Sequence, residues 1–260
     1  MEVSDDLVAD YGERGYAVIR NFFPRDMLLA YRAFLQQAMD RDVRPVFERA
    51  GLKIDDPNLT ANALRLIQGG PPLTAADRQT LLGHFPLPVR LSDRIRPIAR
   101  FVGESALLKA ILGSDDLFMH MPPMARFVLP NYTPAGVPAH QDASYNAHMS
   151  SFVTIWTPLV PIDASCGGLL LFEGSCHLTQ PVQTAANGWL DPIDVRGLTP
   201  SQPVGLDAGD VVLLSPAIVH ASVPNTSERI RFSMDLRVFG AGVRSEKHHM
   251  NLKTLETIGN

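Results

Sequence analysis

Hydrophobic and polar residues follow two different periods along the chain, and the first is helical. Apolar side chains recur at helical spacing after Pro24, which predicts an amphipathic helix. These positions are Met27, Leu28, Tyr31, Phe34, Leu35 and Met39. Thr74 to Asp77 has the residue types of a capped helix start, and residues 92–112 are again helical in pattern up to Gly113. The first part of the chain is therefore predicted to be mainly helical, with a short helix and then a strand at 15–20 near its beginning.

From about residue 117 the apolar residues occur in short segments, several of them alternating with a period of two. Pro, Gly and Asn separate these segments, as in chains of short strands joined by turns. The segments are LFMHM (117–121), MARFVL (124–129), SFVTIWTPLV (151–160), GGLLLFEG (167–174), VVLLSPAIVH (211–220) and IRFSMDLRVF (230–239). We predict a mainly β fold with flanking helices, in which residues 1–260 form one domain. A helical part at about 1–114 packs on one outer face of a jelly-roll core at about 115–240.

Composition narrows the possible partners. The chain has 260 residues, 45% hydrophobic and 19% charged, with a formal net charge of -4 and no concentrated basic face, which argues against nucleic acid binding. Apolar runs such as Val211–Leu214 are far shorter than the roughly 20 residues of a membrane helix. The first residues show no charged-then-apolar signal pattern. We expect a cytoplasmic protein with a small-molecule substrate; the sequence leaves its oligomeric state open.

The two cysteines are predicted to be free thiols. Cys166 and Cys176 flank an apolar segment that has the pattern of a strand. As a strand, that segment would hold the cysteines about 33 Å apart. A disulfide requires Cα atoms within about 7 Å of each other.

Three residues of the β region are candidate metal ligands. His140 and Asp142 are two positions apart, so on an extended strand both side chains point to the same face. His220 lies at the end of a later apolar segment. Two histidines and one carboxylate form the facial triad of non-heme Fe(II) oxygenases, which leaves three coordination positions open. His-x-Asp also occurs by chance, and the alternative is a hydrogen-bonded polar pair at a strand end.

An arginine strengthens the metal-site hypothesis. Residues 220–231 have the pattern of a hairpin, and a turn centred between Asn225 and Thr226 would place Arg231 opposite His220. Ser222 would share that face. A guanidinium inside a barrel is costly without an anion, so Arg231 and Ser222 are expected to bind one carboxylate of a keto dicarboxylate that chelates the iron. The alternative is a structural Arg231 paired with an internal acid, Asp210 or Asp235.

At this point the chain resembles the phytanoyl-CoA dioxygenase family of Fe(II)- and 2-oxoglutarate-dependent oxygenases over about residues 115–240. The matching stretches are VPAHQDASY (137–145), IWTPL (155–159), IDASCGGL (162–169), GSCH (174–177), AGD (208–210) and His220 through Arg231. The resemblance implies that His140, Asp142 and His220 bind iron, and that Arg231 with Ser222 holds the distal carboxylate of 2-oxoglutarate. It also places Gln141 and Trp156 in the cosubstrate pocket. One departure is Cys176, which interrupts the usual Gly-Ser-His of the family.

The function implied by the resemblance is a dioxygenase that uses Fe(II), 2-oxoglutarate and O2. Such an enzyme hydroxylates or desaturates a C–H bond of a small organic molecule, and a natural-product intermediate in secondary metabolism is the expected substrate. Two alternatives are a cupin-type metal enzyme that does not use 2-oxoglutarate and a non-catalytic jelly-roll binding module. An inward Arg231 disfavours the first alternative, and three convergent ligands disfavour the second.

Several further residues have two interpretations. Tyr145 either reaches toward substrate or packs under the helices. Arg126 and Arg237 alternate with apolar neighbours, so they either meet a substrate anion or lie on an exposed strand face. His120 and His148 are further candidates for the pocket.

Overall fold

The structure is a computed structural model of the chain and describes residues 5–178, 185–186 and 189–259. Most helices precede the β core. They are α1 (Asp5–Arg14), α2 (Arg25–Ala38), the π-helix η1 (Met39–Val43), α3 (Arg44–Arg49), α4 (Leu59–Gly69), α5 (Ala75–Leu81), α6 (Leu87–Arg90), the 3-10 helix η2 (Asp93–Ile95), α7 (Arg96–Gly103) and α8 (Ala106–Leu112). Three short 3-10 helices follow later: η3 (Thr133–Ala135), η4 (Asp142–Tyr145) and η5 (Ser175–His177). Within the described residues, no helix has the length and apolar character needed to cross a membrane.

The larger of two facing sheets has eight antiparallel strands. Along one path their order is β1 (Tyr16–Ile19), β9 (Val211–Leu214), β4 (Val153–Pro158), β11 (Arg231–Gly240), β2 (Leu117–His120), β12 (His249–Asn251) and β13 (Thr257–Ile258). The eighth strand, β3 (Met124–Val128), pairs with the first half of β11. β11 is therefore bordered by β4 on one edge and by β3 and β2 on the other. The N-terminal strand predicted at 15–20 is β1, which joins this sheet beside β9.

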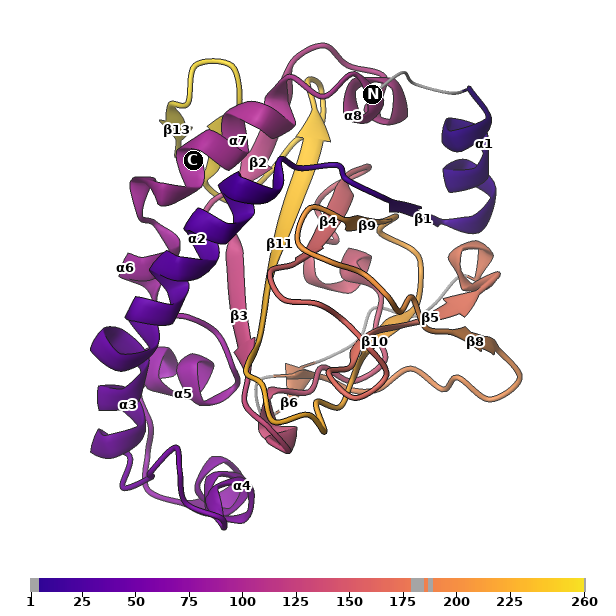
Figure 1. Cartoon of the computed structure of the whole chain (residues 1–260). Helices are drawn as coiled ribbons and strands as arrows, with labels where there is room; N and C mark the ends of the chain where they lie inside the picture. The colour runs from indigo at the N-terminus through magenta and orange to yellow at the C-terminus, as the bar shows by residue number, and fades with distance from the viewer. Residues whose placement is uncertain (1–4, 179–184, 187–188, 260) are drawn as a thin grey trace.

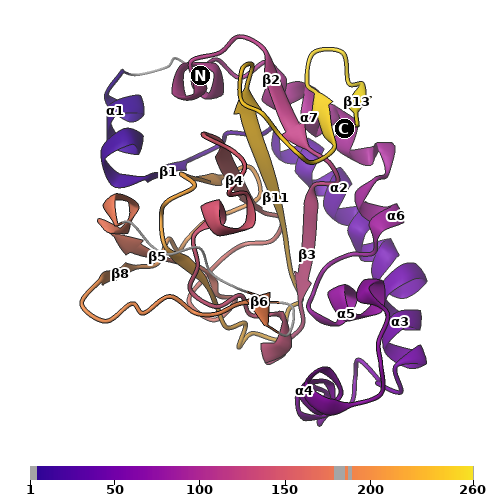
Figure 2. The ribbon, with the colours of Figure 1, turned by 180° about the vertical axis from the view of Figure 1, so that it is seen from behind.

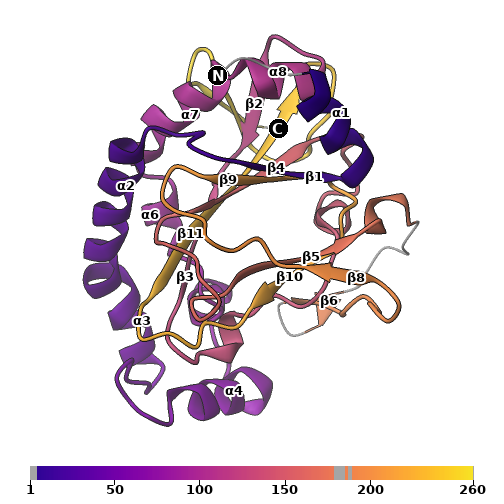
Figure 3. The same cartoon turned by 45° about the vertical axis from the view of Figure 1, so that its right-hand side comes forward.

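The smaller sheet faces the larger one. Its order is β10 (His220–Val223), β5 (Gly168–Glu173) and β8 (Thr199–Ser201). A separate two-stranded ribbon consists of β6 (Ala185–Ala186) and β7 (Trp189–Leu190). Figure 3 shows β1, β9 and β4 of the large sheet lying above β5, β10 and β8 of the small sheet. This is the double-stranded β-helix predicted from the period-two segments, although β12 and β13 extend the large sheet beyond residue 240.

Helices cover one side of the large sheet, and the small sheet lies on the other (Figures 1 and 2). α2 buries Leu28, Tyr31 and Leu35 against this side, as its helical spacing predicted. Every residue of β4 is buried, because the helices cover one of its faces and the interior of the barrel covers the other. The predicted arrangement of helices on one outer face is confirmed.

The predicted start of α5 is also confirmed. Thr74 is the N-cap, and its hydroxyl oxygen accepts a hydrogen bond from the Asp77 backbone N–H at 3.0 Å. Replacing Thr74 with Ala is expected to lower the free energy of unfolding by about 1 kcal/mol, because one N–H at the helix start loses its acceptor. Urea unfolding measures this, with Thr74→Ser as the control that keeps the acceptor. Equal stability of the Ala and Ser variants would contradict this role of the cap.

The predicted hairpin between His220 and Arg231 is wrong. His220 pairs with Leu171 of β5, whereas Arg231 pairs with Val128 of β3, so the two strands lie in different sheets. The connection between them does not form a tight turn, because its residues are hydrogen-bonded to other parts of the chain. Asn225 is buried and its side-chain amide donates to the carbonyls of Val128 and Arg229. The chain therefore crosses from one sheet to the other between β10 and β11.

Candidate active site

A cavity of about 310 Å³ lies between the two sheets and contains most of the predicted site residues. Both sheets contribute to its wall: His220 and Ser222 come from β10, Trp156 from β4, and Arg231 from β11. His220 and Arg231 lie in different sheets and do not pair with each other, but both side chains line the same cavity. The two sequence-distant halves of the predicted site thus meet, by a route that the hairpin interpretation did not anticipate.

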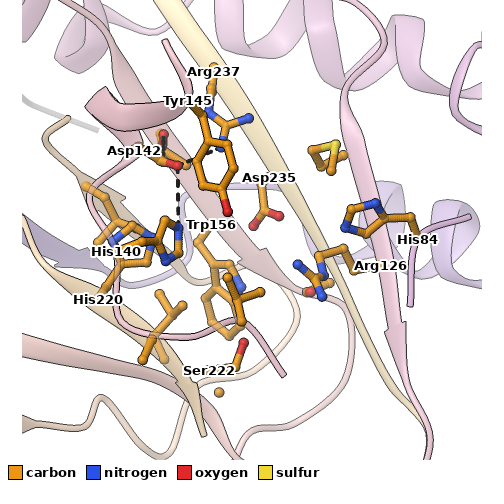
Figure 4. A pocket seen from close by; sticks show the side chains of 18 of the residues that line it. His84, Arg126, His140, Asp142, Tyr145, Trp156, His220, Ser222, Asp235 and Arg237 are labelled. Carbon is orange, nitrogen blue, oxygen red and sulfur yellow. Dashed lines mark hydrogen bonds and ion pairs between the residues drawn. The ribbon is translucent and has the colours of Figure 1, made fainter. Parts of the chain in front are cut away.

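The three candidate ligands converge inside this cavity. Ligand atoms of His140, Asp142 and His220 all lie within 4.8 Å of one another, and all three residues are buried. The Nε2 of His140 is 3.8 Å from the Oδ1 of Asp142, and the centroids of the two imidazole rings are 4.3 Å apart. Figure 4 shows the two rings and the carboxylate facing a common point. Within the described residues, this is the only group of three potential ligands placed to hold a metal ion.

The backbone fixes the orientation of both histidines. His140 and His220 each donate their backbone N–H to the carbonyl of the other, at 2.9 Å in both directions. The Nδ1 of His140 bonds the Pro138 carbonyl at 2.8 Å, and the Nδ1 of His220 bonds the Ile218 carbonyl at 3.1 Å. Each Nδ1 is thereby the protonated nitrogen, which leaves each Nε2 with its lone pair for a metal. Burial, reinforced by the neighbouring His220, lowers the pKa of His140 to about 3, so its ring is in the neutral form that metals bind.

The local backbone at His140 and Asp142 differs from the predicted extended strand. Only His140 makes a β-bridge, and Asp142 begins the 3-10 helix η4. The chain turns here because the Ala143 N–H donates to the Pro216 carbonyl and the Ser144 N–H donates to the Gln141 carbonyl. The two side chains converge because of this turn and not because of strand alternation.

Two neighbours hold the Asp142 carboxylate. The guanidinium of Arg237 donates to Oδ1 at 2.6 Å, and the Thr154 hydroxyl donates to Oδ2 at 2.5 Å. Burial alone would raise the pKa of Asp142, but the Arg237 charge, with contributions from both histidines and Thr154, lowers it below its usual value. The carboxylate is therefore ionised and oriented. The alternation of apolar and polar residues did not reveal this role of Arg237. Its side chain lies in the interior and not on an exposed strand face.

The hydroxyl of Thr154 provides a test of this orientation. Thr154→Val is expected to weaken Fe(II) binding about 10–100-fold, the range typical for hydrogen-bond partners of metal ligands. Equilibrium titration with Fe(II) under anaerobic conditions measures the affinity. Thr157 on the same strand is the matched control, because its buried hydroxyl has no hydrogen-bond partner in the described part of the chain. If Thr157→Val weakens Fe(II) binding equally, the effect comes from the packing of β4 and not from the hydrogen bond to Asp142.

Arg231 lies in the wall of the cavity on the Ser222 side. It is 3% exposed, and its guanidinium donates to the carbonyls of Val223 at 3.0 Å and Gly168 at 3.3 Å. Burial, together with the charge of Arg126, lowers its pKa to about 10, so it remains a cation at neutral pH.

The alternative of a structural ion pair for Arg231 is not supported. Asp210 pairs instead with Arg20, at 2.8 Å. The charge of Asp235 acts favourably on Arg231, but no ion pair joins the two among the described residues, and the Nε of Arg231 has no hydrogen-bond partner there. A buried guanidinium whose hydrogen bonds to the described residues go to neutral carbonyls suits an incoming carboxylate.

Trp156 and Gln141 have different positions relative to the cavity. Trp156 lines it, as predicted. Gln141 is buried but is not among the lining residues; its side-chain amide donates to the Ala217 carbonyl in the connection between β9 and β10. Gln141 thus ties the segment after His140 to the segment that precedes His220.

The remaining candidates also separate into lining and non-lining residues. Tyr145 lines the cavity, with its ring edge-on to His140 at 5.4 Å between centroids. Arg126 is buried in the wall, where it donates to the carbonyls of Ala135 and Leu82, so the exposed-face interpretation is wrong for it as well. His120 and His148 stack on each other with centroids 6.2 Å apart and do not line the cavity. Lys247 also lines the cavity, although no sequence pattern singled it out.

Both cysteines are free, as predicted. Cys166 is buried, and Cys176 is partly buried beside the first helix, where its thiol contacts the Glu13 carbonyl. Neither lines the cavity.

Comparison with known proteins identifies the family. The sequence profile described as phytanoyl-CoA dioxygenase (PhyH) matches residues 11–233. The chain belongs to the phytanoyl-CoA dioxygenase family. As a member, it is a non-heme iron enzyme of the 2-oxoglutarate-dependent oxygenases, with Fe(II), 2-oxoglutarate and O2 as its cofactor and cosubstrates. The cupin-type and binding-module alternatives have no support.

Solved structures of this oxygenase class have a similar fold. The 2-oxoglutarate-dependent epimerase SnoN and carbocyclase SnoK, both from nogalamycin biosynthesis, are 18% and 16% identical, with TM-scores of 0.59 and 0.62. Each comparison covers 94% of this chain, and 85% of SnoN or 87% of SnoK. EvdO2 from Micromonospora carbonacea var. aurantiaca is 19% identical, with a TM-score of 0.56 over 94% of both chains. SnoN has also been solved with Fe3+, alpha-ketoglutarate and a nogalamycin compound.

A curated relative is more similar in sequence over a shorter region. The 1-deoxypentalenic acid 11-beta-hydroxylase of Streptomyces arenae is 32% identical over 115 residues. This region is 39% of the present chain and spans 40% of the hydroxylase.

Proposed function

We propose that this protein is a dioxygenase that hydroxylates or desaturates a C–H bond of a small natural-product intermediate. His140, Asp142 and His220 would bind the iron, and Arg231 with Ser222 would bind the distal carboxylate of 2-oxoglutarate. The names of the relatives support the substrate class, since they act in nogalamycin biosynthesis and on 1-deoxypentalenic acid. The proposal includes the cytoplasmic location and the single-domain organisation expected from the sequence.

The ligand set fits Fe(II). Two imidazoles with free Nε2 lone pairs and one ionised carboxylate converge from one side, which is the donor set of the facial triad. When bound, the iron with 2-oxoglutarate and O2 supplies the oxidant for C–H cleavage, with succinate and CO2 as the products of the cosubstrate. The chain contributes the orientation of this centre: the bridge between His140 and His220 sets the spacing of the rings, while Arg237 and Thr154 hold the carboxylate.

The clamp residues fit a dicarboxylate. Arg231 offers a buried cation whose Nε has no partner among the described residues, and Ser222 lines the same cavity with a hydroxyl. In a site of low dielectric, a charge-assisted contact of this kind fixes one end of the cosubstrate and so orients its other end toward the metal. Trp156 would pack beside the cosubstrate and limit the access of water.

The single observation that carries this proposal is the convergence of the three ligand atoms in one cavity that also contains Arg231. Anaerobic addition of Fe(II) and 2-oxoglutarate is expected to produce the weak visible charge-transfer band of a keto acid chelated to Fe(II). Succinate replaces 2-oxoglutarate as the control, because it lacks the keto group and cannot chelate in the same way. A protein that binds both compounds without any visible band would contradict the proposed assignment.

A further inference from the structure

Positive charge is left over in the cavity after the metal and the cosubstrate are accounted for. The cavity is lined by four cationic side chains, Arg126, Arg231, Arg237 and Lys247, and by two carboxylates, Asp142 and Asp235, which leaves a net charge of +2. Fe(II) would add two positive charges, and the 2-oxoglutarate dianion would add two negative charges. The loaded site therefore keeps its excess of +2, and excess charge in a partly buried site is costly unless an anion compensates it.

The surplus can be traced to two of the cations. Arg231 is matched by the cosubstrate, and Arg126 has the carboxylate of Asp235 as a favourable charge in its neighbourhood. Arg237 is paired with Asp142, but that carboxylate also has to compensate the metal. Lys247 meets only neutral acceptors among the described residues: its Nζ donates to the Tyr145 carbonyl at 3.0 Å and to the Oδ1 of Asn146 at 2.7 Å.

Arg237 and Lys247 lie on the same side of the cavity. Arg237 binds the first residue of η4, Asp142, and Lys247 binds the last, Tyr145, so the two cations flank a single short turn. Lys247 is an exposed residue although its side chain lines the cavity, which places it at the mouth. An ammonium group has three N–H donors, and two of them are engaged, so one remains for a ligand.

We infer that the substrate is an organic acid, and that its carboxylate binds Lys247 at the cavity mouth within the field of Arg237. This inference rests on the proposed function, because it takes the metal and the cosubstrate as bound. The body of the acid would extend inward past Tyr145 and Met124, which both line the cavity, toward the metal ligands. A carboxylate suits the site better than a phosphate, because Lys247 has one free N–H and a phosphate dianion needs several donors.

The test compares acids with neutral molecules of the same shape. Calorimetric titrations of the anaerobic protein, loaded with Fe(II) and 2-oxoglutarate, use octanoate and cyclohexylacetate beside their methyl esters. Each acid is expected to bind up to about fivefold more tightly than its ester, the upper end for a contact that is partly exposed to water. Lys247→Met is expected to abolish this preference, and Lys247→Arg to retain it.

Lys253→Met is the matched control, because Lys253 is exposed on the same C-terminal segment and does not line the cavity. Esters that bind as tightly as acids, or an acid preference that survives in Lys247→Met, would overturn the inference. Octyl phosphate forms a further arm: if it binds more tightly than octanoate, and only when Lys247 is present, the carboxylate assignment is wrong. The visible band of the loaded protein separates the two proposals, because its absence in the wild type contradicts the iron site, whereas an intact band without acid preference contradicts only this inference.

Discussion

Replacing Asp142 with Asn or Ala is expected to weaken Fe(II) binding at least about a hundredfold and to abolish turnover. The loss should exceed the 10–100-fold typical for residues that only support a ligand, because the only carboxylate of the ligand set is removed. Asp142→Asn nearly preserves the side-chain volume and can still accept a hydrogen bond from Arg237, so it separates metal loss from packing loss. Anaerobic Fe(II) titration and succinate release measure the two effects.

The control for this experiment is Asp194→Ala, since Asp194 is exposed and, among the described residues, forms its ion pair with Arg196. It should keep full iron occupancy and full turnover. His220→Ala should behave like the Asp142 variants. Substrate oxidation at the wild-type rate in Asp142→Asn, with iron fully bound, would show that another group completes the metal site.

The second large effect is expected for Arg231, the residue proposed to bind the distal carboxylate of 2-oxoglutarate. Arg231→Ala should raise the 2-oxoglutarate concentration needed for half-maximal turnover at least about tenfold, because charge-assisted hydrogen bonds contribute about 1.5–3 kcal/mol. Iron affinity without cosubstrate should change little, since Arg231 does not contact the three ligands. Initial rates of succinate formation against 2-oxoglutarate concentration give the measurement.

Arg229→Ala is the matched control for Arg231→Ala. Arg229 is two residues away in sequence, but it is half-exposed and pairs with Asp163 outside the cavity at 2.6 Å. Its loss should leave the 2-oxoglutarate requirement unchanged. If Arg231→Ala behaves in the same way, the clamp is elsewhere, and Arg126 becomes the next candidate because it also lines the cavity.

Local sequence signals predicted much of the fold. The helical spacing after Pro24, the cap at Thr74 and the end of the last helix at Gly113 are all present in the structure. These features depend on contacts within a few residues, which a sequence displays directly. The helix predicted over 92–112 is divided at Ser105, whose hydroxyl caps α8 by accepting from the Leu108 N–H. Ser105 therefore starts a second helix. The division was not predicted, because apolar residues continue at helical spacing through this region.

Long-range register could not be predicted in the same way. The hairpin interpretation assumed that neighbouring strands pair with each other, whereas β10 and β11 pair with strands that lie far away in sequence. The contact between Arg237 and Asp142 depends on this register and joins residues 95 positions apart. Lys247 reaches the cavity only because the segment after β11 folds back toward η4. The triad and Arg231 could still be proposed as site residues, because the ordered motifs that resemble the family point to them without any knowledge of pairing.

The position of β11 also governs when the protein can fold. This strand lies in the interior of its sheet and joins β4 on one side to β3 and β2 on the other (Figure 1). During synthesis, β2, β3 and β4 leave the ribosome long before β11, so their backbone N–H and C=O groups remain unpaired at open edges. A chain that stops before residue 231 is therefore expected to aggregate and not to form a smaller stable protein. Iron is therefore expected to bind only after translation has passed β11, because the wall of the cavity lacks Arg231, Asp235 and Arg237 before then.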